Sequence, residues 1–254
     1  MRDSSHMKER QDLLIEYVVN HGRTSVDDLA EYLGVSKVTI RKDLDSLSEQ
    51  GLLRRERGYA IPNQRRDIHY QMAFQLQQKE RIAREAVRYV QDGETLIIEA
   101  GSTCALFAKA LAENRKDVTI ITNSLYLASY IQDYNSVHII LLGGALQTES
   151  RALVGPLTKQ SVSAFHVDKI FLGTDGFSEE LGFTGNDMIR SETLEYMLKS
   201  ADHVYVLTDS MKFRQPGAVS FLKTEDATCV ITDAGISDAT KSYLEARGIT
   251  VISV

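Results

Sequence analysis

The sequence predicts an α/β protein with a small helical module at the front and a larger layered body behind it. Residues 26–60 show helical periodicity followed by the spacing of a hairpin. From Thr95 onward, short runs rich in β-branched residues alternate with helical segments. The chain has 254 residues, and because a domain typically holds about 100 to 200 residues, two domains fit this length better than one.

The strongest local pattern is VDDLAEYLGVSKVTIRKDL, which begins at Val26. Val26, Leu29 and Leu33 recur at helical spacing and predict a first helix. Gly34 supplies a turn, and Ser36 stands where its hydroxyl can cap a second helix. We expect the second helix to turn three further apolar residues inward: Val38, Leu44 and Leu47. Two helices joined at a glycine predict a helix-turn-helix.

A basic hairpin follows these helices. Leu52 and Leu53 precede three arginines, and Gly58 closes the turn, so we expect a wing. Hydroxyls and long cations on the second helix and the wing suit contacts to phosphates and to base edges in the major groove. The candidate DNA-binding residues are Ser36, Lys37, Thr39, Arg41, Lys42, Arg54, Arg55 and Arg57. The expected partner is double-stranded operator DNA.

The overall charge argues against nucleic acid, whereas its distribution argues for it. The chain carries a formal net charge of -6. Residues 34–66 nevertheless hold eight Lys and Arg against four Asp and Glu, which gives this segment a charge of +4. A basic segment inside an acidic chain is the electrostatic signature of a DNA-binding module.

Proline, asparagine and glutamine interrupt the pattern after the hairpin. We therefore expect a winged helix-turn-helix over residues 7–60, a linker over 61–78 and a second domain over 79–254. Residues 1–6 resemble a vector remnant. No apolar run approaches the ~20 residues that span a bilayer. Because Cys104 and Cys229 are the two cysteines and lie far apart, we expect a cytoplasmic protein with reduced thiols.

Continuous β-branched runs predict buried parallel strands in the second domain. They lie at 95–98, 118–122, 137–142, 169–172, 204–208, 228–232 and 250–254. Helical segments lie at 79–90, 105–113, 124–132, 156–165, 187–200 and 238–247. This alternation predicts a mostly parallel sheet with crossover helices.

Small and polar residues follow five of these strands. Ligands in open α/β sheets lie beyond the carboxyl ends of the strands, so these loops predict a binding site. The candidate residues are Glu99, Gly101, Ser102, Thr103, Asn123, Ser124, Gly143, Gly144, Asp175, Gly176 and Lys212. Glycines allow close backbone approach, hydroxyls and helix N-terminal amides bind an anion, and Lys212 adds a positive charge. The expected ligand is a small molecule that bears a phosphate.

Several motifs in this order closely resemble the DeoR family of bacterial transcriptional regulators. They are VSKVTIRKDL, DGETLIIEAGST, VTIITNS, ILLGG, VGP, DKIFLGTDG, LTDSMKF and VITDAG, and they cover nearly the whole chain from Met7. The resemblance implies a winged helix-turn-helix and a sensor domain similar to ribose-5-phosphate isomerase. It also implies a repressor of a carbohydrate or polyol operon, released from DNA by a phosphorylated sugar or polyol.

The resemblance also assigns roles to the strand-end residues by motif match. Ser102 and Thr103 match the phosphate-side hydroxyls. Asp175 matches the polyol-side carboxylate, and Lys212 matches the sensor lysine. The second and third loops of the site match at Asn123, Ser124, Gly143 and Gly144.

The sequence does not assign a definite role to five further residues. Glu99 stands where the family usually has aspartate, and it is expected to shape sugar selectivity. Tyr59 stands in the wing where glycine is common, and it either stacks on a sugar or packs on the wing. Arg151 and Arg190 either neutralise a phosphate or lie on the surface. Cys104 is either a redox sensor or a small buried thiol.

An enzyme is the alternative to a regulator, namely a sugar-phosphate isomerase or deaminase with an accessory DNA-binding segment. Glu99, Asp175, Asp209 and Lys212 offer acid–base groups for such a reaction. The loops contain no histidine–carboxylate constellation, and an enzyme has no use for a recognition helix. We therefore expect no catalytic residues, no cofactor and no metal. Two DNA half-sites favour a homodimer or homotetramer.

Overall fold

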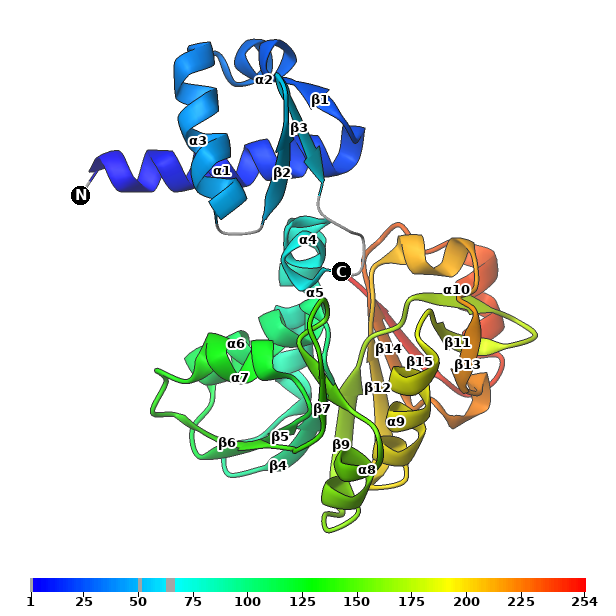
Figure 1. Cartoon of the computed structure of the whole chain (residues 1–254). Coiled ribbons are helices and arrows are strands. Elements are labelled where there is room, and N and C mark those ends of the chain that lie inside the picture. The colour runs from blue at the N-terminus through cyan, green and yellow to red at the C-terminus, as the bar shows by residue number, and fades with distance from the viewer. Residues whose placement is uncertain (1, 50–51, 63–66) are drawn as a thin grey trace. The chain divides into compact units, whose positions relative to one another are not determined.

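The computed structural model of the chain describes residues 2–49, 52–62 and 67–254. It divides into two compact units, Met1–Leu76 and Gln77–Val254, and Figure 1 shows the elements of each. Arg65 and Arg66, which contribute to the basic charge of the segment 34–66, lie outside the described residues.

Helices and short strands make up the N-terminal unit. Its elements are α1 (Arg2–His21), β1 (Thr24–Ser25), α2 (Val26–Leu33), α3 (Lys37–Glu49), β2 (Leu53–Glu56), β3 (Tyr59–Pro62) and α4 (Ile68–Ala73). The three strands form an antiparallel sheet in the order β1-β3-β2. The predicted helix-turn-helix and wing are confirmed, whereas α1 and β1 are elements that the sequence pattern did not predict.

Local hydrogen bonds explain where α2 and α3 begin. Ser25 Oγ accepts a hydrogen bond from the Asp28 amide, and Ser36 Oγ accepts one from the Thr39 amide, each at 3.1 Å. Each serine thereby satisfies an amide that has no partner inside its own helix. Gly34 ends α2 with a φ of 63°, a left-handed conformation that glycine adopts without a Cβ clash.

Helix α3 differs from the expectation at Val38. Leu44 and Leu47 are buried as expected, but Val38 is 59% exposed and Ile40 is buried instead. The reason is helical phase, because positions 40, 44 and 47 recur at intervals of four and three, whereas 38 lies on the opposite side. The expectation that Val38 faces the core was therefore wrong.

The segment 61–78 differs from the expected linker. Strand β3 runs to Pro62, and Tyr70 of α4 lies in the N-terminal hydrophobic core. Asp67 Oδ1 caps α4 by accepting hydrogen bonds from the amides of His69 and Tyr70 at 2.9 and 3.3 Å. Helix α5 (Leu76–Ala86) begins soon after α4 ends. Regular structure thus occupies most of this segment, and residues 63–66 lie outside the described residues.

A seven-stranded parallel sheet forms the centre of the C-terminal unit. Its strands are β4 (Thr95–Ile98), β5 (Val118–Thr122), β6 (Val137–Leu141), β9 (Val167–Leu172), β12 (Ala201–Leu207), β14 (Cys229–Thr232) and β15 (Thr250–Ser253). They lie in the order β15-β14-β12-β9-β4-β5-β6, and every neighbouring pair is parallel. The predicted parallel sheet is confirmed.

Helices cover this sheet, as Figure 1 shows. Besides α5 they are α6 (Ser102–Asn114), α7 (Leu125–Ile131), α8 (Pro156–Val162), α9 (Met188–Leu198) and α10 (Asp238–Glu245), with short 3₁₀ turns η1 (Val87–Tyr89), η2 (Ser210–Arg214) and η3 (Thr224–Asp226). Leu96, Ile97 and Ile98 of β4 are all fully buried. Burial of consecutive residues means that both faces of the sheet are covered, which explains the continuous apolar runs. Among the described helices, none is long and apolar enough to cross a membrane.

Two small antiparallel sheets were not predicted. One pairs β7 (Ala145–Gln147) with β8 (Ala152–Val154), and the other contains β10 (Gly176–Ser178), β11 (Gly182–Gly185) and β13 (Val219–Leu222). These strands are three or four residues long and contain several glycines. Glycine and short length are typical of turns, so the sequence pattern gave them no strand signal.

Candidate functional site

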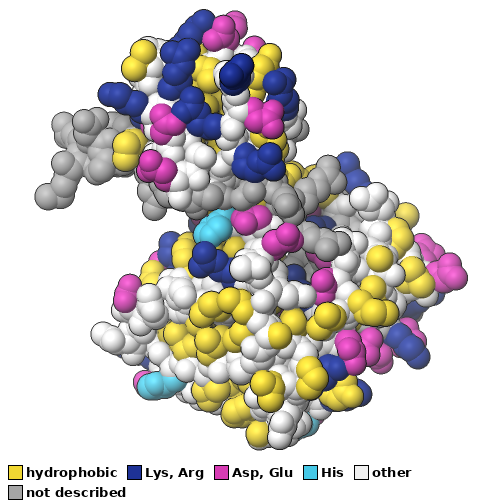
Figure 2. All heavy atoms as spheres, viewed as in Figure 1, with side chains coloured by type: hydrophobic (Ala, Val, Ile, Leu, Met, Phe, Trp, Pro, Cys, Tyr) yellow, Lys and Arg dark blue, Asp and Glu magenta, His cyan; other side chains and the backbone are white. Residues whose placement is uncertain are grey.

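The N-terminal unit displays the predicted cations on its surface, and Figure 2 shows Lys and Arg side chains over it. Arg41 and Lys42 on α3 are exposed, as are Arg54 and Arg57 around the wing. Such side chains are available to contact phosphates without disturbing the core.

Several members of the predicted DNA-binding set have partners in the protein, including Arg54, whose Nη2 lies 3.8 Å from Glu56 Oε1. Lys37 Nζ lies 2.8 Å from Asp27, and Arg55 pairs with Asp45 on α3. Ser36 Oγ caps α3 and lies 2.9 Å from Thr39 Oγ1. Any DNA contact by these side chains therefore competes with an existing interaction.

The Tyr59 side chain packs within the N-terminal unit. The guanidinium carbon of Arg23 lies 3.4 Å from the centroid of the Tyr59 ring, a cation–π contact. Of the two interpretations that the sequence left open, the structure favours packing, because Arg23 already covers this ring.

The strand order of the central sheet reverses between β4 and β9, and we call this position the switch point. From β4 the sheet extends to β5 and β6 on one side, and to β9, β12, β14 and β15 on the other. Open α/β sheets bind ligands at the carboxyl ends of the strands where this order reverses. The loops at that position hold Glu99 to Thr103 after β4 and Gly173 to Gly176 after β9.

A buried ion pair lies at this switch point. Glu99 is 1% exposed, and Arg190 of α9 donates to both of its carboxylate oxygens, from Nε at 2.8 Å and from Nη2 at 3.1 Å. Arg190 also donates to the Ala100 carbonyl. Burial opposes the charge on Arg190, but the Glu99 carboxylate outweighs burial and holds the pKa of Arg190 above its ordinary value. Arg190, whose side chain is 22% exposed, thus pairs with a buried carboxylate, and this pair links the end of β4 to α9.

Asp175 lies beside this ion pair. Its Oδ2 accepts a hydrogen bond from the Asn186 amide at 2.9 Å, and its charge acts on both Glu99 and Arg190. Burial raises the pKa of Glu99, Arg190 opposes that rise, and Asp175 adds to it. Arg190, Glu99 and Asp175 therefore lie together at the switch point, one positive side chain with two acidic ones.

The predicted residues after β5 are engaged within the protein. Asn123 Oδ1 accepts a hydrogen bond from the Ala100 amide at 3.0 Å, and Asn123 Nδ2 donates to the Leu153 carbonyl at 3.2 Å. Ser124 Oγ accepts from the Leu127 amide at 3.0 Å and caps α7. These side chains fix the loops around the site, and a direct ligand contact would break existing bonds.

The glycines after β6 and β9 allow close packing. A Cβ on Gly144 would lie 2.9 Å from the Val154 oxygen, and one on Gly176 would lie 2.6 Å from the Gly217 nitrogen. The Gly143 carbonyl accepts a hydrogen bond from Thr158 Oγ1 at 2.7 Å. These residues therefore act on the shape of the site through the backbone.

The start of α6 offers hydrogen-bond donors at the switch point. Gly101 is the N-cap residue, and Ser102 and Thr103 form the first turn with exposures of 7% and 6%. No hydrogen bond joins either hydroxyl to another described residue. The first amides of a helix lack intrahelical partners and carry partial positive charge, so this end of α6 is suited to an anion.

Two cations lie near Asp209, which follows β12, and the sequence reasoning missed one of them. Lys79 of α5 is only 4% exposed. Burial lowers the pKa of Lys79 to about 7, the Asp209 carboxylate opposes this shift, and Lys212 of η2 adds to it. Lys79, Asp209 and Lys212 therefore lie close together. No sequence signal distinguishes Lys79 from a solvated lysine, because its burial depends on contacts with residues far along the chain.

Hydrogen bonds fix the loop that carries Lys212. Asp233 accepts from the Ser210 amide at 2.6 Å, from Ser210 Oγ at 2.8 Å and from the Gly235 amide at 3.0 Å. Asp209 accepts from the Met211 amide at 3.2 Å. Two buried carboxylates thus hold the segment after β12 in one conformation.

Cys104 and Arg151 were left open by the sequence. Cys104 is fully buried, and burial raises the pKa of its thiol well above the ordinary value. This favours a small buried thiol, since a redox sensor needs an accessible thiolate. Arg151 has a positive φ of 49° in the exposed turn before β8.

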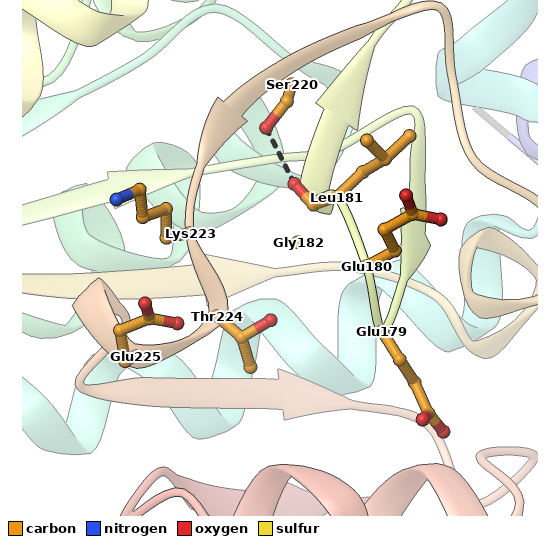
Figure 3. Close-up of a pocket in the computed structure, with 8 residues that line it drawn as sticks. All are labelled: Glu179, Glu180, Leu181, Gly182, Ser220, Lys223, Thr224 and Glu225. Atoms are coloured by element: carbon orange, nitrogen blue, oxygen red, sulfur yellow. Dashed lines mark hydrogen bonds between the residues drawn. The ribbon is translucent and has the colours of Figure 1, made fainter.

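A separate pocket of about 310 Å³ lies at the turn between β10 and β11 (Figure 3). Its lining residues are Glu179, Glu180, Leu181, Gly182, Ser220, Lys223, Thr224 and Glu225. None of them belongs to the predicted site. Three carboxylates against one ammonium group make this pocket unsuited to a phosphate.

Comparison with known families matches both units. Residues 10–69 match the DeoR-like helix-turn-helix domain, and residues 75–234 match the DeoR C terminal sensor domain. The second match alone covers more than half of the chain.

Curated relatives match along nearly their whole length. The chain is 32% identical over 250 residues to the HTH-type transcriptional regulator GlpR of Haloferax volcanii, with 96% of each chain covered. It is 32% identical over 229 residues to the glycerol-3-phosphate regulon repressor of Escherichia coli, with 89% of this chain and 90% of the relative covered. It is 29% identical over 252 residues to a putative aga operon transcriptional repressor of Escherichia coli O157:H7, with 97% of this chain and 93% of the relative covered.

Solved structures resemble part of the fold. Ribose 5-phosphate isomerase A from Methanocaldococcus jannaschii aligns at 22% identity and a TM-score of 0.39, over 53% of each chain. The chain thus spans about half the length of that enzyme. A probable sor operon regulator from Shigella flexneri aligns at 12% identity and a TM-score of 0.44, over 68% of this chain and 88% of the other.

Proposed function

The chain belongs to the DeoR family of DNA-binding transcriptional regulators, and from this premise we propose that it is a repressor whose effector is a phosphorylated sugar or polyol. The observation that carries the proposal is the start of α6, where the Ser102 and Thr103 hydroxyls have no hydrogen-bond partner among the described residues. They lie at the reversal of strand order, the position at which such sheets bind ligands.

The charges in this part of the sheet support a phosphate. The first amides of α6 and its two hydroxyls provide neutral donors. We propose that Lys212, in the 3₁₀ turn after β12, and Lys79, which lies near it, add positive charge to this site. Charge-assisted hydrogen bonds to a dianion are about twice as strong as neutral ones. We assign the phosphate to Ser102, Thr103 and Lys212.

The Asp175 carboxylate is suited to a polyhydroxylated ligand. Asp175 Oδ2 accepts from the Asn186 amide, and Oδ1 accepts no hydrogen bond from a described residue. A carboxylate oxygen accepts hydrogen bonds from sugar hydroxyls. The name of one relative, the glycerol-3-phosphate regulon repressor, agrees with a phosphorylated polyol as effector.

Family membership favours sensing over turnover, because both matched domains are those of a regulator. Of the acid–base groups that the enzyme alternative names, Glu99 has no free oxygen for a substrate proton, since both of its oxygens accept from Arg190. We therefore propose that the protein returns its ligand unchanged. Incubation with a panel of sugar phosphates followed by mass spectrometry tests this, and a new product that appears with protein and not without it would support the enzyme.

The assembly and location follow from DNA binding. An operator with two half-sites is matched by a symmetric protein, so we propose a homodimer or homotetramer that acts in the cytoplasm, where it meets the chromosome. Light scattering of the full chain with and without operator measures the mass. A monomer on and off DNA would contradict the proposal.

Calorimetry tests the effector class. Sugar and polyol phosphates should bind at least tenfold more tightly than the same compounds without phosphate, because an uncharged ligand leaves Lys212 without its partner. Lys212→Met should remove most of this difference. Lys223→Met, in the pocket of Figure 3, is the matched control and should bind like the unaltered protein. Equal affinity for phosphorylated and dephosphorylated ligands would contradict the assignment.

The direction of the switch is measured with the same titration. We propose that ligand binding favours release from DNA, and reciprocity then requires operator DNA to lower ligand affinity by the same factor. Ligand affinity that is indifferent to operator would contradict a ligand-triggered switch.

A further inference from the structure

We propose that Val38 reads the C5-methyl group of a thymine in the operator. Val38 is 59% exposed, the largest exposure among the large hydrophobic side chains described in the N-terminal unit. The inference rests on the DNA-binding role of this unit and is independent of the identity of the effector.

The position of Val38 on α3 places it on the outer face. Ile40, Asp43, Leu44 and Leu47 are the buried residues of this helix. Val38 lies three and four residues before Arg41 and Lys42, both exposed, so these three side chains share one stripe at helical spacing. An apolar side chain therefore stands next to two cations that suit phosphate contacts.

The first turn of a recognition helix is the part that meets base edges. In α3 this turn holds Lys37, Val38 and Thr39. Lys37 pairs with Asp27 at 2.8 Å, and Thr39 Oγ1 lies 2.9 Å from Ser36 Oγ. Val38 is the remaining side chain of this turn, and it makes no competing polar contact.

The chemistry of valine selects one feature of a base pair. Valine has no hydrogen-bond donor or acceptor in its side chain, so it cannot read the donor and acceptor pattern of the major groove. The thymine C5-methyl group is the apolar feature that this groove displays, and small apolar side chains contact it. Burial of two apolar surfaces against each other gives discrimination against cytosine and against any pyrimidine without the methyl group.

Local stability gives no reason for valine at this position. A β-branched residue on an exposed helix position loses side-chain freedom and is a poorer helix former than alanine or lysine. Val38 also contributes nothing to the buried core of this unit. Replacement should therefore leave folding intact, which separates recognition from stability.

The experiment uses the full chain and a selected operator. The protein first selects its sites from a pool of random double-stranded oligonucleotides. In the best site, each thymine is then replaced singly by deoxyuridine, which keeps base pairing and removes only the methyl group. At one position per half-site, binding should weaken by about fourfold, the ratio that corresponds to ~0.8 kcal/mol for one buried methyl-sized group.

Two variants that differ by one methyl group complete the test. Val38→Ser should bind the thymine and deoxyuridine operators equally, whereas Val38→Thr should keep part of the preference because threonine retains a methyl group. Circular dichroism of both variants should match the unaltered protein. Indifference of the unaltered protein to every deoxyuridine, or full sensitivity of Val38→Ser, would overturn the proposal. A pool that yields no bound sequence would contradict the DNA-binding role itself.

Discussion

The two units of the protein place their charges in opposite environments. In the N-terminal unit, Arg41 and Lys42 are exposed on α3. In the C-terminal unit, Lys79 and Glu99 are buried, and Arg190 reaches inward to Glu99. Exposed cations suit the DNA backbone, whose phosphates they can contact singly. Buried charges suit a small ligand that the protein encloses. The same residue types thus occupy two environments, one suited to DNA and the other to a small ligand, and burial distinguishes them.

Arg190→Met should have the largest effect on stability. It leaves Glu99 buried without its partner, and breaking a buried ion pair from one side costs about 3–5 kcal/mol. Arg41→Met, on the exposed face of α3, should change the free energy of unfolding by less than about 0.5 kcal/mol. Denaturant unfolding of the full chain measures both.

A double variant checks the cause of this loss. Glu99→Met together with Arg190→Met removes both charges and should recover much of the stability, because no uncompensated charge remains. If the double variant is as unstable as Arg190→Met alone, the arginine acts through packing and the contrast between the units is wrong.

Gly176 of the C-terminal unit and Gly58 of the N-terminal unit have different roles, and substitution should show it. Gly176→Ala places a Cβ 2.6 Å from the Gly217 nitrogen, so it should cost at least about 1–3 kcal/mol as overpacking. Gly58 turns the wing with a φ of 74° and has no atom within 4 Å of an added Cβ. Gly58→Asn should therefore be nearly neutral, because asparagine tolerates this conformation. Thermal unfolding of the two variants tests the distinction, and equal losses would contradict it.

The pH dependence of ligand binding should expose the buried lysine. Burial lowers the pKa of Lys79 to about 7 despite the Asp209 carboxylate, and a phosphate bound nearby would favour the protonated form. Ligand binding then takes up a proton above pH 7, so affinity should fall with rising pH by a factor that approaches ten per pH unit.

Calorimetry in buffers of different ionisation enthalpy measures this proton uptake directly. Lys79→Met should flatten the pH profile above pH 7, whereas Lys223→Met should keep it. A profile that is unchanged in Lys79→Met would show that another group takes up the proton.

The smallest expected effect concerns the wing. Asp45 of α3 pairs with Arg55, and both side chains are partly exposed. Asp45→Asn removes a negative charge from the face that carries the predicted DNA-binding cations and releases Arg55. Binding to DNA should therefore tighten about two- to threefold, in keeping with the small energy of exposed ion pairs. The slope of affinity against salt concentration should become steeper, since one more cation meets the backbone. A weaker or unchanged slope in Asp45→Asn would show that Arg55 does not reach a phosphate.

The sequence predicted the elements that local chemistry determines. Serine caps, the Gly34 turn and apolar spacing located α2 and α3, and β-branched runs located all seven strands of the central sheet. These signals act within a few residues of each other, so they are visible in one dimension. The apolar pattern gave the wrong prediction at Val38, which is exposed while Ile40 is buried. The first turn of a helix contains too few residues to show which side faces the core.

The tertiary structure decided which polar residues of the strand-end loops have partners. Asn123 bonds to Ala100 and Leu153, and Glu99 bonds to Arg190, 91 positions away along the chain. Lys79 is buried, and the Asp209 carboxylate, far along the chain, acts on its pKa. Side-chain type and spacing do not encode such partners, since burial and charge pairing depend on which distant segments the sheet order brings together. The sequence by itself determined the family, the two kinds of fold and the end of the sheet at which we propose the site. The three-dimensional arrangement determined which of those residues keep hydrogen-bonding groups for a ligand and which are already bonded.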